Sequence, residues 1–321
     1  MSNAWEVYDL LQDSADSDAV VEEALIGVAW TWVQTADGSG LAMSPAAGVR
    51  TLPWAGTLAG KSLRELQSWV RLWDPHQAAV GMAAINAGIG CPEEWAGQAT
   101  PLTPHAAPSN LAVFDYFLPR LQGKRVAVVG RYPGLERYAE SLDLIVLERN
   151  PGAGDLPDPA CEYVLPEAEW VFLTGSSLPN KTFPRLAELS RNANLVLMGP
   201  TVPWLTELRD FGVDFIAGTQ VVDEAALRRI VVEGGGTRIF GAGVGYRVLD
   251  LGEGQMHWLS SAIAELVGCQ ERLRREMEKW HAAARGGSFP KAEELLTVNH
   301  ELSELDMQFN RLWDARHSAR C

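Results

Sequence analysis

The residues whose types could do chemistry gather where apolar runs end, and the run VAVVG is the first example. Folds that bind dinucleotides place three glycines at this turn. One makes the turn, one lets the backbone approach the pyrophosphate, and one lets the next helix pack on the strand. Here Gly130 stands first, but Tyr132 and Leu135 occupy the other two positions and Pro133 stiffens the loop. We therefore expect a ligand without a pyrophosphate, or an anion bound by Arg131.

An acidic residue, Glu148, closes the next apolar run, LDLIVLE. In dinucleotide-binding folds a carboxylate at this place binds the hydroxyls of a ribose. Glu148 is therefore a candidate general base, or a group that binds hydroxyl or amino groups of a ligand. The alternative is that Gly130 only turns the chain, and that Glu148 and Arg149 are solvated or paired at the surface.

Five short apolar runs follow one another between about residues 120 and 220, with helix-like stretches between several of them. They are RVAVVG, LDLIVLE, EWVFLTG, ANLVLMG and VDFIAG. This rhythm predicts a doubly wound α/β domain, in which helices cover both faces of a parallel sheet. Ligands of such sheets bind beyond the carboxyl ends of the strands, so the residues directly after each run are the first candidates for a site.

The first 115 residues mix both kinds of pattern. WEVYDLLQ has helical spacing, and residues 25–44 alternate around the turn ADGSG, which predicts a β-hairpin. Two helical stretches follow, KSLRELQSWVRLW and HQAAVGMAAINAGI. Residues 91–109 are rich in proline and small residues and predict a long connection. We therefore expect an α+β domain at 1–115 and the α/β domain at 116–250.

Residues 251–321 have a third pattern, in which apolar residues recur in steps of four and three on both sides of RGGSFP. The first series is Leu259, Ile263, Leu266, Gln270, Leu273, Met277, Trp280 and Ala284, and the second is Leu295, Val298, Leu302, Leu305, Phe309 and Leu312. This spacing predicts an antiparallel helical hairpin. Because two helices leave part of an apolar stripe uncovered, we expect a homodimer through residues 256–318, built as a four-helix bundle.

The composition bounds the partners. The chain has 321 residues, is 47% hydrophobic and carries a formal net charge of -14, which disfavours nucleic acid as a partner. We find neither a secretory leader nor an apolar window of membrane length, so we expect no membrane partner and a cytoplasmic location. The four cysteines form no CxxC pair, which favours reduced thiols over a disulfide framework or a zinc knuckle.

Several strings, taken in order, resemble one family. They are GVAWTWV, GLAMSP, GMAAINA, VAVVGRYP, LERNPGAGDLP, LPEAEWVFLTGSSLPNKT, LVLMGPTVP and FIAGTQVVD. From about residue 20 to 235 they resemble the bacterial and archaeal putative heavy-metal chelation family, whose function is unknown. The resemblance implies a domain similar to the N-terminal domain of enolase, a Rossmann-like domain partly similar to methyltransferases, and a site in the cleft between them. The helical hairpin is an addition.

Carried over position by position, the resemblance implies a set of ligand-binding residues. They are Asn86, Gly130, Arg131, Pro133, Glu148, Asn150, Pro151, Thr174, Gly175, Asn180, Thr182, Gly199 and Pro200. Asn180 or Thr182 would cap the helix FPRLAELSRNA, whose amides could meet an anion or carboxylate. Asn86 would reach across the cleft. The alternatives are capping alone for Thr182 and a satisfied buried amide for Asn86.

The family name implies a transition or heavy metal, or an organic chelator, but the sequence contains no compact cluster of metal ligands. The scattered candidates are Asp74, His76, Cys91, His105, Glu148 and Asp155, together with His300, Glu301 and Glu304 in the hairpin. For the hairpin residues we favour solvated positions beside the core, because Leu302, Leu305 and Phe309 take the core face.

Three classes of function remain. We favour a binding protein for a small molecule or a metal chelate, acting in metal homeostasis or cofactor metabolism. The first alternative is an enzyme, a transferase or hydrolase of a small heterocyclic or chelator-like compound, with Glu148 as base and Asn86, Arg131 and Asn180 as positioning groups. The second alternative is a scaffold that acts through the hairpin.

Overall fold

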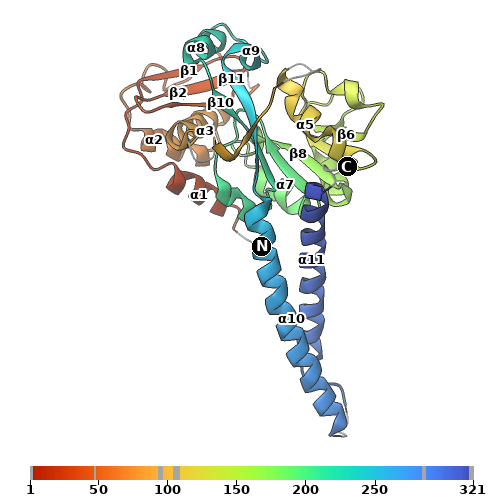
Figure 1. Cartoon of the computed structure of the whole chain (residues 1–321). Helices are drawn as coiled ribbons and strands as arrows, with labels where there is room; N and C mark the ends of the chain where they lie inside the picture. The colour runs from red at the N-terminus through yellow and green to blue at the C-terminus, as the bar shows by residue number, and fades with distance from the viewer. Residues whose placement is uncertain (1–2, 47, 93–96, 104–108, 284–286, 318–321) are drawn as a thin grey trace. The chain divides into compact units, whose positions relative to one another are not determined.

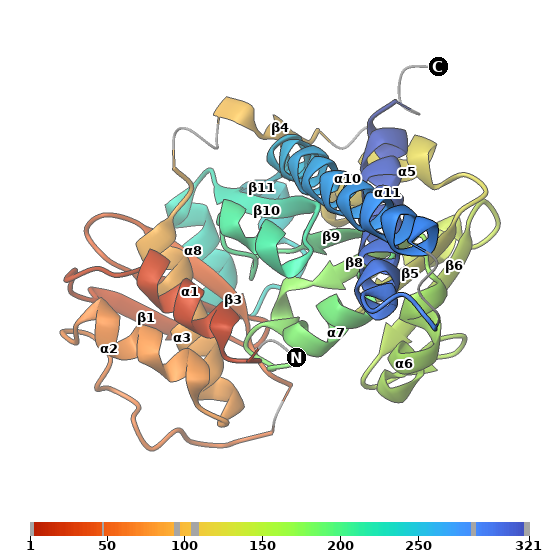
Figure 2. The same ribbon diagram turned by 90° about the horizontal axis from the view of Figure 1, so that it is seen from below.

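The computed structural model describes residues 3–46, 48–92, 97–103, 109–283 and 287–317. The chain forms two compact units, Met1–Asp250 and Leu251–Cys321 (Figure 1). The first unit contains two sheets. Figure 2 shows the small sheet with its helices on one side of this unit and the large sheet on the other.

The small sheet is antiparallel and has the order β1-β2-β3, where β1 is Glu23–Ile26, β2 is Trp30–Gln34 and β3 is Ser39–Met43. β2 and β3 form the predicted hairpin. The start of the predicted hairpin also contains a second turn: residues 27–29 connect β1 to β2, which pair antiparallel. A Cβ at Gly27 would lie 2.7 Å from the carbonyl oxygen of Val231, so only glycine allows this turn.

Three helices accompany the small sheet: α1 Glu6–Ser14, α2 Leu63–Ser68 and α3 Pro75–Ile89. The 3-10 helix η1 Trp69–Arg71 extends α2. Most residues of α3 are buried. A Cβ at Gly40 in β3 would lie 2.2 Å from both the Ala83 oxygen and the Ala87 nitrogen. The backbones of α3 and β3 are therefore in direct contact, and the predicted helices of this region are confirmed.

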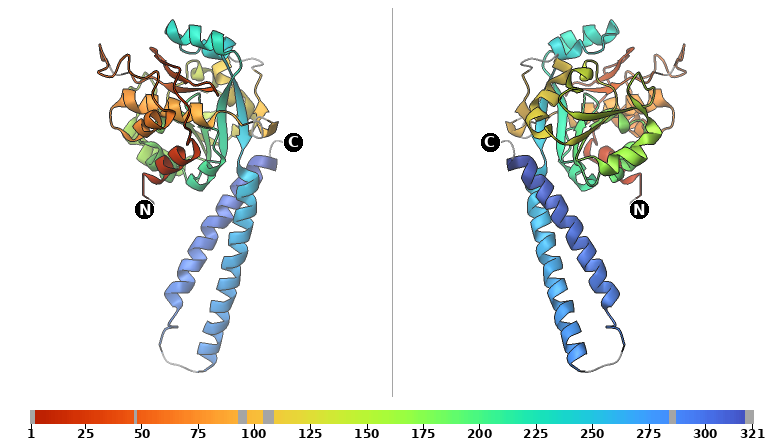
Figure 3. Two further views of the ribbon diagram at one scale, coloured as in Figure 1. Left: turned by 90° about the vertical axis from the view of Figure 1, so that its left-hand side faces the viewer. Right: turned by 90° about the vertical axis from the view of Figure 1, so that its right-hand side faces the viewer.

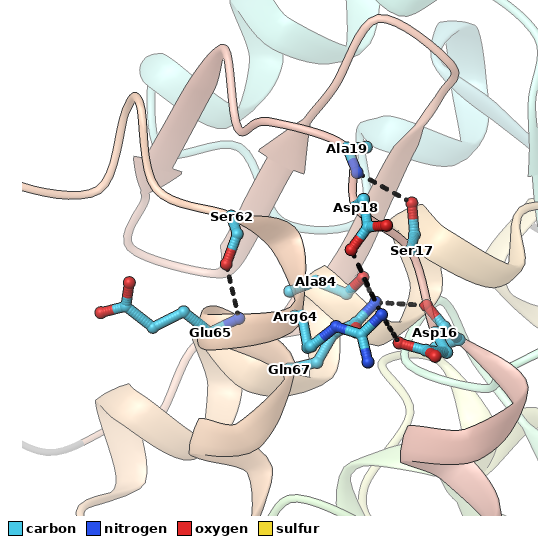
Figure 4. A network of polar contacts seen from close by, with 10 residues as sticks. Asp16, Ser17, Asp18, Ala19, Ser62, Arg64, Glu65, Gln67 and Ala84 are labelled. Carbon is cyan, nitrogen blue, oxygen red and sulfur yellow. Dashed lines mark hydrogen bonds and ion pairs between the residues drawn. The ribbon is translucent and has the colours of Figure 1, made fainter.

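A polar network fixes the segment between α1 and β1 (Figure 4). Arg64 contacts Asp16 at 2.6 Å and Asp18 at 3.2 Å, and the buried Gln67 donates from Nε2 to the Ala15 oxygen at 2.6 Å. Since Gln67 is the buried member, its hydrogen bond contributes more to stability than the exposed ion pairs do.

The large sheet has the order β4-β11-β10-β9-β8-β5-β6-β7. Its strands are β4 Thr100–Pro101, β5 Arg125–Val129, β6 Asp143–Glu148, β7 Leu156–Pro157, β8 Trp170–Thr174, β9 Asn194–Met198, β10 Phe215–Val221 and β11 Val244–Asp250. The five predicted runs form β5, β6, β8, β9 and β10, and they pair in parallel. From β7 to β10 the order is that of doubly wound dinucleotide-binding sheets. The predicted connection at 91–109 adds the edge strand β4, which is antiparallel to β11.

The helices of this part are α5 Ala112–Leu121, α6 Cys161–Val164, α7 Phe183–Leu189, α8 Glu224–Val232 and α9 Ile239–Ala242. Shorter 3-10 helices are η2 Ser109–Leu111, η3 Leu135–Tyr138, η4 Asp158–Ala160, η5 Leu165–Glu167, η6 Gly175–Ser177 and η7 Thr206–Phe211. The mixed α/β prediction is confirmed, but several crossovers lack a full α-helix. Between β5 and β6, for example, Pro133 and Gly134 leave room only for η3.

The two sheets share one core. Trp30, Trp32 and Leu41 of the small sheet pack with Leu227 and Val231 of α8, which connects β10 and β11 of the large sheet, and the same cluster includes Val244 of β11. We infer that the wall between the two sheets is fixed by packing, because such a core resists relative movement.

The second unit consists of two long helices, α10 Gly252–Ala282 and α11 Ala292–His317, which run antiparallel (Figure 3). The predicted hairpin is confirmed. Leu273 and Val298 are buried, and Gln270 donates to Asn299 at 2.6 Å. Ala284 and the side chain of Leu312 lie outside the described residues. Within the described chain, no helix is both long enough and apolar enough to cross a membrane.

Candidate functional site

A cavity of about 890 Å³ lies where strands β5, β6, β8 and β9 end, and Trp30 and Met43 of the small sheet also line it, together with Ser44, which follows β3. Ten of the residues that the resemblance implied line this cavity: Gly130, Arg131, Pro133, Glu148, Asn150, Thr174, Asn180, Thr182, Gly199 and Pro200. Asn86, Pro151 and Gly175 are not among its lining residues. The fold therefore brings most of the set together, while their binding role stays a prediction.

Glu148 holds two loops of the cavity wall. Its Oε2 accepts a hydrogen bond from the backbone nitrogen of Arg131 at 2.8 Å, and its Oε1 accepts one from that of Asn150 at 3.2 Å. The first bond fixes the turn after β5, where Gly130 has a φ of 100°. The carboxylate is thus shared by two backbone amides, and its role as a general base stays a prediction.

Arg131 is neutralised by a carboxylate. Its Nη1 donates to Asp155 Oδ2 at 2.6 Å, and the same oxygen accepts from the Gly152 nitrogen at 2.8 Å. A Cβ at Gly152 would lie 2.0 Å from Arg131 Nη1, so glycine makes room for the guanidinium. The structure gives no support to Arg131 as a free anion site, because its charge is already paired. Arg149 pairs with Asp158 at 3.0 Å, as the surface alternative expected.

Asn86 lies behind the cavity wall and connects the two sheets. Its Nδ2 donates to the Leu41 oxygen at 2.7 Å and to the Thr201 oxygen at 3.1 Å. Thr201 belongs to the loop after β9, and its Oγ1 accepts from the Met43 nitrogen at 2.9 Å. Asn86 therefore does cross between the predicted domains, and both of its amide hydrogens serve the fold. Its buried Oδ1, however, has no hydrogen-bond partner in the described chain, so the alternative of a satisfied buried amide holds for the donors and not for the acceptor.

Gly175 also supports the wall from behind. A Cβ at this position would lie 2.7 Å from Val202 Cγ2 and 2.9 Å from the Val202 nitrogen. The chain after β8 therefore touches the loop after β9 at backbone distance, which explains a glycine here without any ligand.

The predicted capping of helix 183–189 is wrong. Thr182 stands at the N-cap position of α7, but its φ and ψ are -91° and -17° and its side chain makes no capping bond. It donates instead to the Ser177 oxygen at 3.4 Å. A capping side chain needs extended backbone and a nearby free N–H, and Pro184 in the first turn has none. The exposed side chain of Asn180 makes no hydrogen bond within the described residues.

Lys181, between those two residues, was not predicted. It is the only residue other than glycine with a positive φ in the described chain, at 62°. Its Nζ donates to the Leu72 oxygen and, at 2.9 Å, to the Pro179 oxygen. Burial lowers the pKa of Lys181 to about 8, against a smaller raising effect of Asp74. Nothing in the sequence pattern distinguishes this lysine from a surface one.

Two tyrosines in the lining have buried hydroxyls. Neither the Tyr132 nor the Tyr246 hydroxyl makes a hydrogen bond of good geometry among the described residues. Burial raises the pKa of both phenols, and for Tyr132 the nearby Thr174 side chain acts weakly in the opposite direction. Tyr246 stacks on Phe240 with ring centroids 4.7 Å apart, and Tyr132 packs edge-on against Phe114 at 5.6 Å. Both phenols are therefore neutral donors at neutral pH, held in fixed positions. Tyr246 lies inside strand β11, where its sequence context predicts only core.

The side chains that the structure describes do not fit a bare metal ion. Within the described chain, no three His, Cys, Asp or Glu side chains lie close enough to hold one. Asp74 caps α3 by accepting from the Gln77 nitrogen at 2.8 Å, and burial raises the pKa of the Cys161 thiol to about 11. His300 is exposed and 3.6 Å from Glu304. His105 lies outside the described residues.

Two family models, both described as "Putative heavy-metal chelation", match residues 8–89 and 112–250. An uncharacterised protein of Methanocaldococcus jannaschii is 38% identical over 109 residues, which are 31% of this chain and 42% of that protein. The chain therefore spans less than half the length of that curated relative.

Two crystal structures of proteins with unknown function from the DUF364 family are similar in fold. The one from Desulfitobacterium hafniense has a TM-score of 0.69 and 31% identity, and the match covers 78% of this chain and 100% of that one. The one from Pyrococcus horikoshii has a TM-score of 0.62 and 21% identity, over 77% of this chain and 99% of that one; this shows the fold alone. The family matches end at residue 250, before the hairpin, and the chain belongs to the putative heavy-metal chelation family.

Proposed function

We propose that the cavity binds a small organic molecule that carries its own metal-binding atoms, so that the protein holds a chelator or its metal complex. The observation that carries this proposal is the contrast between a roomy cavity, mostly apolar with a few polar groups, and the absence of three close metal ligands in the described chain. A cavity of about 890 Å³ is in the range that holds an organic ligand. The family description supports metal or chelate binding.

The lining supports a ligand rather than a closed core. Buried polar groups are nearly always hydrogen-bonded, yet the hydroxyls of Tyr132, Tyr246 and Ser177 lack partners in the described structure. The strand order supports a Rossmann-like domain, in which ligands bind at the point where the order reverses. Here that point lies between β5 and β8, at Gly130 and Thr174.

An enzyme acting on the same ligand is the second candidate, and Lys181 favours it. Strained backbone and a perturbed lysine occur together at many functional sites. A compound that changes mass over time when incubated with the protein would establish turnover. A bound compound that stays unchanged leaves the binding protein as the function.

The test is a native mass spectrum and an elemental analysis of the full-length protein, isolated gently from its own cells. The expected result is a bound organic mass, with or without a metal. A metal without an organic mass would overturn the proposal. So would a protein that carries neither and is not stabilised by citrate, by Ni²⁺ or by the two together.

We also propose that the protein is a homodimer through residues 256–318. Ile263, Leu302 and Phe309 are only half-buried in the single hairpin, and Leu296 and Met307 of α11 are exposed. A second hairpin would cover them. Sedimentation of the protein shortened to residues 1–250 tests this. We expect a monomer, and a shortened protein that remains dimeric would contradict it.

A further inference from the structure

We propose that Lys181 binds an anionic oxygen group of the ligand, and that this group is a carboxylate. The inference rests on the proposed function and adds the ligand class. It starts from the charges of the cavity wall. Four cationic residues line the cavity: Arg131, Arg149, Lys181 and Arg185.

Three of these cations already have a carboxylate partner. Arg131 contacts Asp155 at 2.6 Å, Arg149 contacts Asp158 at 3.0 Å, and Arg185 contacts Glu162 and Glu188. Their charges are neutralised where they stand. Lys181 has no ion pair in the described chain, which leaves it as the cation whose charge is available to a ligand.

The ammonium of Lys181 has only neutral partners. Nζ donates to the carbonyl oxygens of Leu72 and Pro179, and it lies 5.9 Å from the centre of the Trp73 ring. An ammonium has three hydrogens, so two carbonyls leave one unused. Carbonyl dipoles fix the position of a charge but do not cancel it. A half-buried charge without a counter-ion is unfavourable, and a ligand anion would relieve that cost.

Asp74 is the nearby carboxylate that acts on Lys181, and it does not neutralise it. Asp74 lies beyond ion-pair distance and accepts the backbone hydrogen bond that caps α3. Its effect on the pKa of Lys181 is smaller than the opposing effect of burial. Lys181 therefore carries a positive charge below about pH 8, and Asp74 is too distant to form an ion pair with it.

The backbone at Lys181 keeps the ammonium where it is. A positive φ costs a residue with a Cβ of the order of 1 kcal/mol, so the turn is held by its surroundings. The neighbouring Asn180 has an exposed amide without a hydrogen bond in the described structure, and it lines the same cavity. Together they offer a charged and a neutral donor from one turn.

The turn after β5 favours a carboxylate over a pyrophosphate. Tyr132 replaces the glycine that would let a pyrophosphate approach the backbone, and Leu135 replaces the glycine that would let the next helix pack on the strand. The hydroxyls of Tyr132 and Tyr246 are neutral donors. A small carboxylic acid with further oxygen or nitrogen atoms fits this lining. Common metal chelators have the same composition.

The test is calorimetric titration of the full-length protein with citrate and with inorganic phosphate, each alone, at pH 6.5 and pH 9.5. We expect citrate to bind at pH 6.5 and to bind at least about tenfold more weakly at pH 9.5, because the amine loses its charge in between. Lys181→Met should bind citrate about tenfold more weakly at pH 6.5 and show little pH dependence. Lys181→Arg should restore binding at pH 9.5.

Lys124→Met is the matched control, because Lys124 is a surface lysine paired with Glu169. Citrate binding that is equal in the wild type and Lys181→Met overturns the inference, and so does tighter binding of phosphate than of citrate. An organic compound without an acid group, found bound to the natural protein, overturns this inference and leaves the proposed function intact. No saturable binding of either acid overturns the inference as well, whereas the proposed function falls only by the outcomes given above for the native mass spectrum and for stabilisation by citrate and Ni²⁺.

Discussion

The two walls of the cavity treat charge in opposite ways. In the wall formed by the loops after β5 and β6, Glu148 accepts two backbone amides and Arg131 is clasped by Asp155. In the turn between β8 and α7, Lys181 has only carbonyl partners and a strained backbone. Charged groups that are paired within the chain stabilise the cavity wall. Groups that lack such a partner remain available to a ligand.

The comparison separates three residues that the resemblance implied from three that it did not. The amide hydrogens of Asn86, the carboxylate of Glu148 and the guanidinium of Arg131 have partners within the folded chain. Lys181 has no counter-ion in the described chain, and the hydroxyls of Tyr132 and Tyr246, like Asn86 Oδ1, have no hydrogen-bond partner there. Substitutions in the first group should therefore cost stability, and those in the second should cost ligand binding but little stability.

The largest effect is expected at Asn86. Asn86→Ala removes two hydrogen bonds from a buried amide and leaves the carbonyls of Leu41 and Thr201 unpaired. Two such losses should lower the free energy of unfolding by about 2–4 kcal/mol. Urea denaturation checks this, with Asn180→Ala as the control, because that exposed side chain should change stability by less than about 0.5 kcal/mol. Equal stability of the two variants would contradict a structural role of Asn86 and favour a role in ligand binding.

Glu148 should come next. Glu148→Ala frees the backbone nitrogens of Arg131 and Asn150 and should cost about 2 kcal/mol, because hydrogen bonds to a charged acceptor are worth more than neutral ones. Glu148→Gln keeps one acceptor oxygen and should lose about half as much. If Glu148 were instead a general base, Glu148→Gln would keep full stability and lose turnover, so denaturation and product formation measured on the same variant distinguish the two roles.

The pH dependence of stability isolates Lys181. Its pKa is about 8 when folded, below its usual value of 10.5. Between these values the unfolded chain binds more protons than the folded one, so the stability of the wild type should rise with pH in this window. Relative to Lys181→Met the gain should be about 1–2 kcal/mol, after allowance for partial exposure. If the difference in unfolding free energy between the wild type and Lys181→Met stayed constant from pH 7 to pH 10.5, the amine of Lys181 would not be desolvated in the folded protein.

Much of this fold could be predicted from residue patterns. The five runs that end at Gly130, Glu148, Gly175, Gly199 and Gly218 predict parallel strands, because buried strands are apolar throughout. The positions of their ends predict where the cavity lies. The C-terminal helical hairpin could be predicted as well, because its apolar residues recur with the period of a helix.

The roles of individual residues could not be read in the same way. Whether Arg131 is free or paired depends on Asp155, which lies on another loop, and only the folded chain brings the two together. Tyr246 reads as core because its strand alternates, and nothing local reveals that its hydroxyl lacks a partner. Which residues of a segment are buried can be predicted from that segment alone. Whether a polar group finds a hydrogen-bond partner depends on other segments that only the fold brings close.

The smallest expected effect is the sharpest check on the comparison. Tyr246→Phe removes a buried hydroxyl that has no partner in the described chain and keeps the ring that stacks on Phe240. Because no hydrogen bond is lost, stability should change by less than about 0.5 kcal/mol or rise slightly. Tyr138→Phe is the matched control: its hydroxyl donates to Asp115 at 2.6 Å, so about 1–2 kcal/mol should be lost there. If Tyr246→Phe lost as much as Tyr138→Phe, its hydroxyl would have a structural partner such as a bound water, and an unpaired group in this wall would no longer indicate a ligand contact.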